Sequence, residues 1–232
     1  MLESFDKVRL QVNSQIAAVR KPATLLVAIE QTLPANSAPA AYLVALTSTL
    51  DQVKPKADPT LHCAVLYLLS LLVPTLDGPQ LQPYASSLLS TSDNLFKTYA
   101  TDAPPLKSLL AIASATLSSL PLATLTSGPV PKRVFTSVLL LTVDARPKVR
   151  RKAQEVVAEV LGNPPTPASK HPYRQESSAW IAEKLDEAVR GAKRSGEGDE
   201  ARAIALLVFV KNLGASWDPA VRCARAEKKA SR

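Results

Sequence analysis

Proline residues divide this chain into apolar blocks of similar length. The 232 residues include 19 prolines and 7 glycines. Proline ends helices but is tolerated in their first turn, whereas hairpin-rich β proteins usually need more glycine in their turns. Inside the blocks, apolar residues recur at three- and four-residue spacing, the helical period, as in Phe5, Val8, Val12, Ile16 and Val19. The sequence therefore predicts many short helices separated by proline-containing turns.

The gaps between the expected helices are short enough to make neighbouring helices antiparallel. Lys21-Pro22 is expected to break the chain, with Pro22 opening the second helix. Pairs of helices recur every ~35 to 45 residues, the spacing of HEAT and armadillo-like arrays. The predicted fold class is all-α, a HEAT/armadillo-like α-solenoid of antiparallel helical hairpins, with a closed helical bundle as the alternative. The expected ranges are Ser4–Arg20, Pro22–Leu33, Ala40–Val53, Thr60–Val73, Tyr84–Tyr99, Leu106–Leu120, Lys132–Val143, Pro147–Leu161, Pro172–Ala192 and Glu200–Leu213.

Residues 1–214 are expected to form one α-solenoid segment. The stretch 121–131 is looser, with threonine, serine and Gly128 between prolines, and is a candidate kink. Residues 215–232 are expected to form a basic C-terminal tail, for which disorder is an open alternative.

The stretch from Asp144 to Ala153 carries a sharper pattern than the rest. It is similar to the turn and second-helix start of a HEAT repeat, where an aspartate in the turn is followed six residues later by an arginine. Valine precedes that arginine, and alanine follows three residues after it. In HEAT arrays the aspartate and arginine form hydrogen-bonded ladders between neighbours, which implies a structural role for Arg150. The residues of this signature are Asp144, Pro147, Val149, Arg150 and Ala153.

A basic surface is expected beside this signature. The formal net charge of +8 favours acidic partners, of which nucleic acid is the commonest. Two interpretations stay open: a solvated helix face, or a site for phosphates and acidic groups that would position nucleic acid without reading its sequence. Phe135 is the one aromatic residue nearby, which argues against specific recognition of single strands. The candidate residues for binding RNA or an acidic partner are Lys132, Arg133, Arg146, Lys148, Arg151 and Lys152.

The sequence contains no recognisable catalytic constellation. Glycine-rich phosphate loops, Gly-x-Ser-x-Gly and His-Glu-x-x-His are absent. His62 and Cys63 occupy adjacent helix positions, which diverge by about 100 degrees and cannot form a nucleophile pair. His171 precedes a proline and is expected to be a cap or surface residue. Cys63 and Cys223 lie far apart, and no cluster has metal-ligand spacing. We therefore expect no enzyme, no cofactor and no metal.

The N-terminus does not resemble a signal peptide, because it carries acidic residues at once and lacks a basic region followed by an apolar one. The most apolar run, Cys63 to Val73, is about half of the ~20 residues that a membrane span needs. These features indicate the cytosol or the nucleus.

Three stretches resemble the ribosomal RNA-processing protein twelve family: Leu2 to Gln15, Lys21 to Leu26 and, most specifically, Leu139 to Gln154. His171-Pro172 and the helix Leu206 to Leu213 also sit where that family has similar elements. The resemblance covers residues 1–214. The tail after Trp217 does not continue the family's repeats.

The resemblance implies a non-enzymatic HEAT-repeat scaffold of the nucleolus and nucleus, with shuttling to the cytoplasm left open. It implies binding to pre-ribosomal RNA and pre-40S particle proteins, and support of pre-rRNA processing and nuclear export of subunits. Ran GTPase and transport receptors are candidate partners, while no membrane and no small-molecule substrate are implied. Members of the family are far longer, so a fragment or a truncated gene model is expected. The alternatives are a karyopherin-like HEAT adaptor that binds proteins, or a non-functional truncated fragment.

Overall fold

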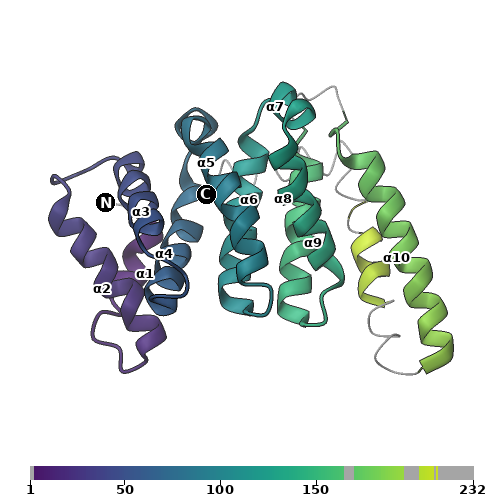
Figure 1. Cartoon of the computed structure of the whole chain (residues 1–232), viewed down its shortest axis with the longest axis horizontal. Coiled ribbons are helices and arrows are strands. Elements are labelled where there is room, and N and C mark those ends of the chain that lie inside the picture. The colour runs from purple at the N-terminus through teal and green to yellow at the C-terminus, as the bar shows by residue number, and fades with distance from the viewer. Residues whose placement is uncertain (1–2, 165–169, 196–203, 212, 214–232) are drawn as a thin grey trace. The chain divides into compact units, whose positions relative to one another are not determined.

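The computed structural model describes residues 3–164, 170–195, 204–211 and 213. All regular elements in these ranges are helices, and no strand occurs among them (Figure 1). The chain divides into two compact units, Met1–Ser119 and Leu120–Arg232. The predicted all-α class is thus confirmed, whereas a kink over 121–131 stays a prediction. The tail predicted over 215–232 lies outside the described residues.

The first unit is built from antiparallel helical hairpins. Helix α4 lies at its centre, since it packs on α2, α3 and α6, and α6 packs in turn on α5. The sequence of α4 is almost entirely apolar, and Val65, Leu68, Leu69 and Leu72 are fully buried. A helix that is apolar on most sides is expected in such a central place. The elements are η1 (Glu3–Phe5), α1 (Asp6–Arg9), α2 (Ala17–Thr32), α3 (Pro39–Gln52), α4 (Pro59–Leu72), η2 (Val73–Thr75), α5 (Gly78–Thr98) and α6 (Ala103–Ser119).

The second unit continues the helical pattern. Helix α8 packs on both α7 and α9. The core of this unit contains Val134 and Val138 of α8 and Val149 and Val157 of α9, all fully buried. Residues 204–211 are helical and fall within the helix predicted over Glu200–Leu213. The other elements are α7 (Leu122–Ser127), α8 (Pro129–Leu140), η3 (Leu141–Val143), α9 (Pro147–Gly162) and α10 (Arg174–Ser195).

The first predicted helix, Ser4–Arg20, is wrong, because the structure interrupts it after α1. In the interruption the Ser14 hydroxyl accepts a hydrogen bond from the backbone N–H of Ile16 at 3.2 Å. Local bonds of this kind compete with helical hydrogen bonds. Helix α2 then begins before Pro22, which lies inside the helix instead of opening it. The break at Lys21-Pro22 is therefore also wrong.

Helix α5 begins earlier than the predicted start at Tyr84, because a capping box fixes its N-terminus. The Asp77 carboxylate accepts a hydrogen bond from the N–H of Gln80 at 2.9 Å, and the Gln80 side chain accepts one from the N–H of Asp77 at 3.4 Å. These bonds provide partners for backbone N–H groups that a helix start leaves unpaired. The helix consequently passes through Pro83.

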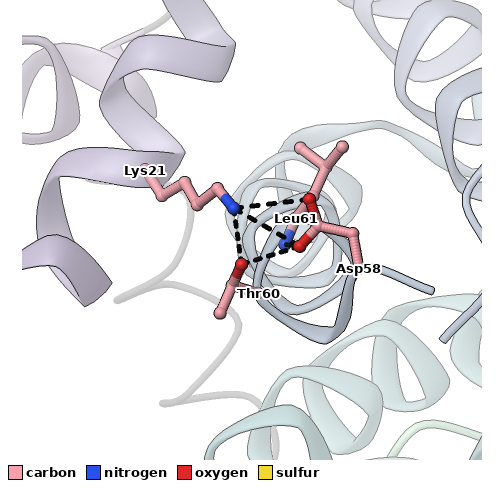
Figure 2. Close-up of polar contacts among 4 residues, drawn as sticks. All are labelled: Lys21, Asp58, Thr60 and Leu61. Carbon is pink, nitrogen blue, oxygen red and sulfur yellow. Dashed lines mark hydrogen bonds and ion pairs between the residues drawn. The ribbon is translucent and has the colours of Figure 1, made fainter. Parts of the chain in front are cut away.

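A polar cluster joins α2 to the first turn of α4 (Figure 2). The Asp58 carboxylate caps α4 by accepting hydrogen bonds from the N–H of Leu61 at 2.8 Å and from the Thr60 hydroxyl at 2.7 Å. Lys21 Nζ lies 3.3 Å from the same carboxylate and donates to the Thr60 hydroxyl oxygen at 2.5 Å. The N–H of Leu61, the hydroxyl of Thr60 and the ammonium of Lys21 lower the pKa of Asp58 to about 2. A lysine–aspartate contact thus links helices of consecutive helical pairs.

The segment 121–131 contains helix α7 and a close turn at Gly128. The N–H of Gly128 donates to the carbonyl oxygen of Thr124 at 3.0 Å. A Cβ on Gly128 would lie 2.8 Å from that oxygen and 3.0 Å from Cδ of Pro131. Only glycine fits this turn without a shift of the backbone, so α7 can lead directly into α8.

Candidate functional site

Helix α9 separates an apolar face from a basic one. Pro147 occupies its first turn, where the missing N–H costs no helical hydrogen bond. Lys148 and Arg151 are exposed, and Lys152 is half-buried. The helical period therefore places three of the predicted cations together near the start of α9, and we call them the α9 basic cluster. The apolar residues on the opposite face are all buried: Val149, Ala153, Val156, Val157 and Val160.

The turn before α9 is held by Asp144 and two arginines. The Asp144 carboxylate accepts hydrogen bonds from the backbone N–H of Arg146 at 2.8 Å, from its Nε at 2.8 Å and from its Nη2 at 2.7 Å. This hydrogen bonding lowers the pKa of Asp144. Arg150 donates from Nη1 to the carbonyl oxygens of Asp144 at 2.7 Å and of Ala145 at 3.4 Å. These contacts stay within one turn, whereas the HEAT resemblance implies a ladder between neighbouring repeats.

Replacing Arg150 by methionine is expected to lower the free energy of unfolding of the second unit by about 1 to 2 kcal/mol, because the turn loses a charge-assisted hydrogen bond. The matched control is Arg151→Met, whose exposed ion pair with Glu155 spans 3.8 Å and should contribute less than about 0.5 kcal/mol. Urea unfolding followed by Trp180 fluorescence in a Trp217→Phe background measures both. Equal losses for the two variants would contradict the role given to Arg150.

The six candidate cations do not form a single patch. Helices α8 and α9 are antiparallel neighbours (Figure 1), so Lys132 and Arg133, near the start of α8, lie beside the end of α9. The rise from Lys132 to the end of α8 is about 12 Å, which separates this pair from the α9 basic cluster. Lys132 also forms an ion pair with Glu176 of α10 at 3.0 Å. Arg146 is engaged by Asp144. The structure thus leaves the α9 basic cluster as the most compact group.

Acidic neighbours reduce the charge of the α9 basic cluster without cancelling it. Glu155 lies 3.8 Å from Arg151 Nε and 3.6 Å from Lys152 Nζ, so one carboxylate is shared between two cations. Such exposed pairs contribute only about 0 to 1 kcal/mol and are easily exchanged for another anion. In the described part of the chain, Lys148 has no acidic group within ion-pair distance.

The position of these cations in α9 is electrostatically unfavourable for the helix alone. The first turn of α9 contains no acidic residue, although Lys148 and Arg150 lie there. A helix N-terminus carries a partial positive charge, and a cation beside it costs about 0.3 to 1 kcal/mol. The same backbone N–H groups attract anions, phosphate among them. The start of α9 is therefore suited to an acidic or phosphate-bearing partner.

An aromatic cluster that no sequence pattern indicates joins α8 to the segment before α10. The ring of Phe135 lies 5.0 Å from that of Tyr173 and 6.3 Å from that of His171. Tyr173 donates its hydroxyl to the carbonyl oxygen of Leu125 at 2.7 Å and its N–H to Nδ1 of His171 at 3.3 Å. Burial lowers the pKa of His171 to about 4. Of the two alternatives expected for His171, a surface residue is wrong, because His171 is buried. Its ring accepts a backbone N–H just before α10, as a capping side chain does.

His62 and Cys63, the adjacent pair on α4, are buried and half-buried, respectively. His62 is buried, its Nδ1 lies 2.9 Å from the Tyr99 hydroxyl, and burial lowers its pKa. Burial raises the pKa of the half-buried Cys63 thiol, which makes it a weaker nucleophile. Over the described ranges, no three His, Cys, Asp or Glu side chains are grouped for a metal ion. No helix in those ranges is long and apolar enough to cross a membrane.

Comparison with known proteins decides the family. Residues 13–208 match the model of the family described as RRP12-like, N-terminal HEAT repeats. The chain belongs to this family. Ribosomal RNA-processing protein 12 of Saccharomyces cerevisiae is 27% identical over 212 residues, and the alignment covers 82% of this chain. It covers only 16% of the yeast protein. No solved structure matches the chain.

Membership in the RRP12-like family confirms both the HEAT type predicted from Asp144–Ala153 and the family resemblance. Repeat domains of this type are typically non-catalytic and present extended surfaces to partners. The comparisons do not test which residues of this chain bind a partner, so the α9 basic cluster stays a prediction.

Proposed function

We propose that this chain is a non-enzymatic scaffold in ribosome biogenesis, acting in the nucleolus and nucleus. It belongs to the RRP12-like family, and its yeast relative is named for ribosomal RNA processing. We propose further that it associates with pre-ribosomal RNA and proteins of the pre-40S particle, and that it supports pre-rRNA processing and nuclear export of the subunit. Ran GTPase and transport receptors are the candidate partners in export.

The α9 basic cluster supports direct contact with RNA. Lys148, Arg151 and Lys152 lie at the positive end of a helix, in a place that costs the helix stability. Lysine and arginine neutralise phosphates whatever the base sequence, so this surface would hold RNA in position without reading it. Lys132 and Arg133 would contact a different part of the RNA backbone, since they lie at the far end of the hairpin.

We expect charge reversal in the α9 basic cluster to weaken RNA binding and to flatten its salt dependence. The variant combines Lys148→Glu, Arg151→Glu and Lys152→Glu. Each lost phosphate contact reduces the slope of log affinity against log salt by about 0.7 to 0.9, so the slope should fall by about 2 to 3. Fluorescence anisotropy with a labelled RNA across a salt series measures this change.

A matched control carries the same change of charge elsewhere. Lys54→Glu, Lys56→Glu and Lys97→Glu alter three exposed lysines of the first unit and should leave most of the slope intact. If both triple variants lose affinity equally, the contact depends on net charge alone. If the original slope is already near zero, the partner is a protein bound through apolar contacts, as in the karyopherin-like alternative.

Affinity purification of the tagged chain from nuclear extract tests the scaffold proposal itself. Precursors of small-subunit ribosomal RNA should be enriched in the eluate, and the α9 basic cluster variant should retain less of them than the first-unit control variant. An eluate without pre-ribosomal RNA or pre-40S proteins would contradict the proposal.

A further inference from the structure

A groove follows one face of helix α10. Two hollows of the second unit open onto this face. The first, of about 70 Å³, lies between α8 and the first half of α10. The second, of about 330 Å³, lies between the second half of α10 and the residues around the start of α9. Residues spaced by three and four positions share one face of a helix, so the two hollows are consecutive along α10. We call them together the α10 groove, and its α10 residues are Ser177, Trp180, Lys184, Glu187, Ala188 and Gly191.

The first hollow has an apolar lining that is partly open to solvent. The buried rings of Phe135 and Tyr173 contribute to it. The half-buried Trp180 of α10 and Leu140, at the end of α8, line the same hollow, and Leu140 is 55% exposed. Grouped apolar side chains at a surface normally mark a contact, and tryptophan is among the residues that contribute most to binding. This part of the α10 groove is therefore suited to a large apolar side chain.

The second hollow has an excess of positive charge. Among the described residues that line it, Arg150 and Lys184 are cations and Glu187 is the one acid. Lys184 donates to both carboxylate oxygens of Glu187, at 2.8 and 2.7 Å. Arg150 donates to carbonyl oxygens, which are neutral, and no carboxylate in the described ranges lies within ion-pair distance of it. A carboxylate from a partner could bind here, and the apolar neighbours of the cations would strengthen its attraction.

We propose that the α10 groove binds an extended segment of a partner protein that carries a large apolar residue and, two or four residues away, an aspartate or glutamate. The rise along α10 is about 6 Å from Trp180 to Lys184 and about 12 Å from Trp180 to Ala188. An extended chain rises about 3.3 Å per residue, so two to four of its residues cover this distance. Alternate side chains of such a chain point the same way, which would turn both the apolar residue and the acid toward the groove.

An RNA strand fits the α10 groove less well than a protein segment does. RNA binding depends mainly on several cations that neutralise phosphates, whereas this groove combines an apolar hollow with a small excess of positive charge. The α10 groove is also distinct from the α9 basic cluster, since Lys148, Arg151 and Lys152 do not line either hollow. The inference does not depend on the proposed function.

A synthetic peptide tests the proposal directly. In Gly-Ser-Leu-Ser-Glu-Ser-Asp-Ser-Gly the acids stand two and four residues after the leucine. Fluorescence anisotropy of the labelled peptide with the full chain should show saturable binding, with a Kd of about 1 mM or tighter. In a Trp217→Phe background, the unlabelled peptide should shift Trp180 emission to the blue, because the leucine would cover the indole ring.

Variants of the charged hollow come with a control on the same helix. Lys184→Gln should weaken binding about threefold, the effect of one partly exposed ion pair. Arg190→Gln also removes an ion pair within α10, that with Asp186, but does not alter the groove lining, so affinity should be unchanged. A peptide with glutamine and asparagine in place of its acids should bind both variants and the native chain equally.

The apolar hollow has its own pair of variants. Leu140→Ser should weaken binding about tenfold, because the peptide leucine loses an apolar partner. Leu10→Ser, which changes an exposed leucine of the first unit, should have no effect. A peptide with serine in place of its leucine should not distinguish Leu140→Ser from the native chain.

Unchanged urea midpoints show that the variants are folded. The absence of saturable binding up to about 1 mM peptide would overturn the proposal. Equal losses in Lys184→Gln and Arg190→Gln would overturn it as well, as would binding that Leu140→Ser leaves unchanged. If a single-stranded RNA displaces the peptide and itself binds less tightly to Lys184→Gln and Leu140→Ser, the groove is an RNA site and the proposal is wrong.

Discussion

Replacing Phe135 by alanine should lower the free energy of unfolding of the second unit by about 3 to 5 kcal/mol. Phe135 is buried in α8 and fills the space against the rings of Tyr173 and His171. Its loss leaves a cavity and weakens the support of the hydrogen bond between the Tyr173 hydroxyl and Leu125. Urea unfolding at neutral pH, followed by Trp180 fluorescence in a Trp217→Phe background, measures the change.

Thr136→Ala is the matched control, because Thr136 is the exposed neighbour on the same helix. Its hydroxyl donates to the carbonyl oxygen of Lys132 at 2.9 Å, within α8. A surface change of this kind should stay within about 0.5 kcal/mol. Phe135→Leu should fall between the two variants. A loss below about 1 kcal/mol for Phe135→Ala would show that the aromatic cluster is not a core element.

Local sequence signals predict most closely three helices that begin at a proline after a short turn, α3, α4 and α9. The ranges expected for Ala40–Val53 and Thr60–Val73 agree with α3 and α4 to within one residue at each end. In both, the proline supplies the first turn and the preceding residue cannot easily be helical. Two of the larger errors occur where hydrogen bonds between a side chain and the backbone fix the end of a helix, at Ser14 and at Asp77. The spacing of apolar residues does not show that the Ser14 hydroxyl bonds to the backbone, or that Asp77 and Gln80 form a capping box.

The candidate site was likewise predictable only in part. Helical periodicity suffices to place Lys148 and Arg151 opposite the buried valines of α9. It does not show that Lys132 lies at the other end of the hairpin, because closeness in sequence conceals the reversal of the chain between α8 and α9. Nor does it show that Arg146 is held by Asp144. Which cations share one surface depends on the order of the helices in space and on their ion pairs. Neither can be read directly from one sequence.

The aromatic cluster could not be predicted from the sequence. Its histidine, His171, is expected to make the stability of the second unit depend on pH. Acidification from pH 7 to pH 4 should lower the free energy of unfolding of this unit by about 2 to 3 kcal/mol through His171. Its pKa is lowered to about 4 by burial, against about 6.5 in the unfolded chain. As pH falls below about 6.5, His171 becomes protonated in the unfolded chain but stays neutral in the folded chain. The stability is therefore complete above that pH and is lost as pH falls toward 4.

The contacts of the His171 ring explain why it stays neutral in the folded chain. Nδ1 of His171 accepts the N–H of Tyr173 at 3.3 Å, and a protonated ring could not accept it. The ring also lies against Phe135, where a charge would be desolvated. In His171→Asn the amide oxygen can accept the same N–H but does not titrate, so the unfolding free energy of the second unit should be nearly flat from pH 6.5 to pH 4 apart from its carboxylates. His62→Asn, in the first unit, should leave the pH dependence of Trp180-detected unfolding unchanged. If His171→Asn retains the full native slope, His171 is not the group that acid titrates.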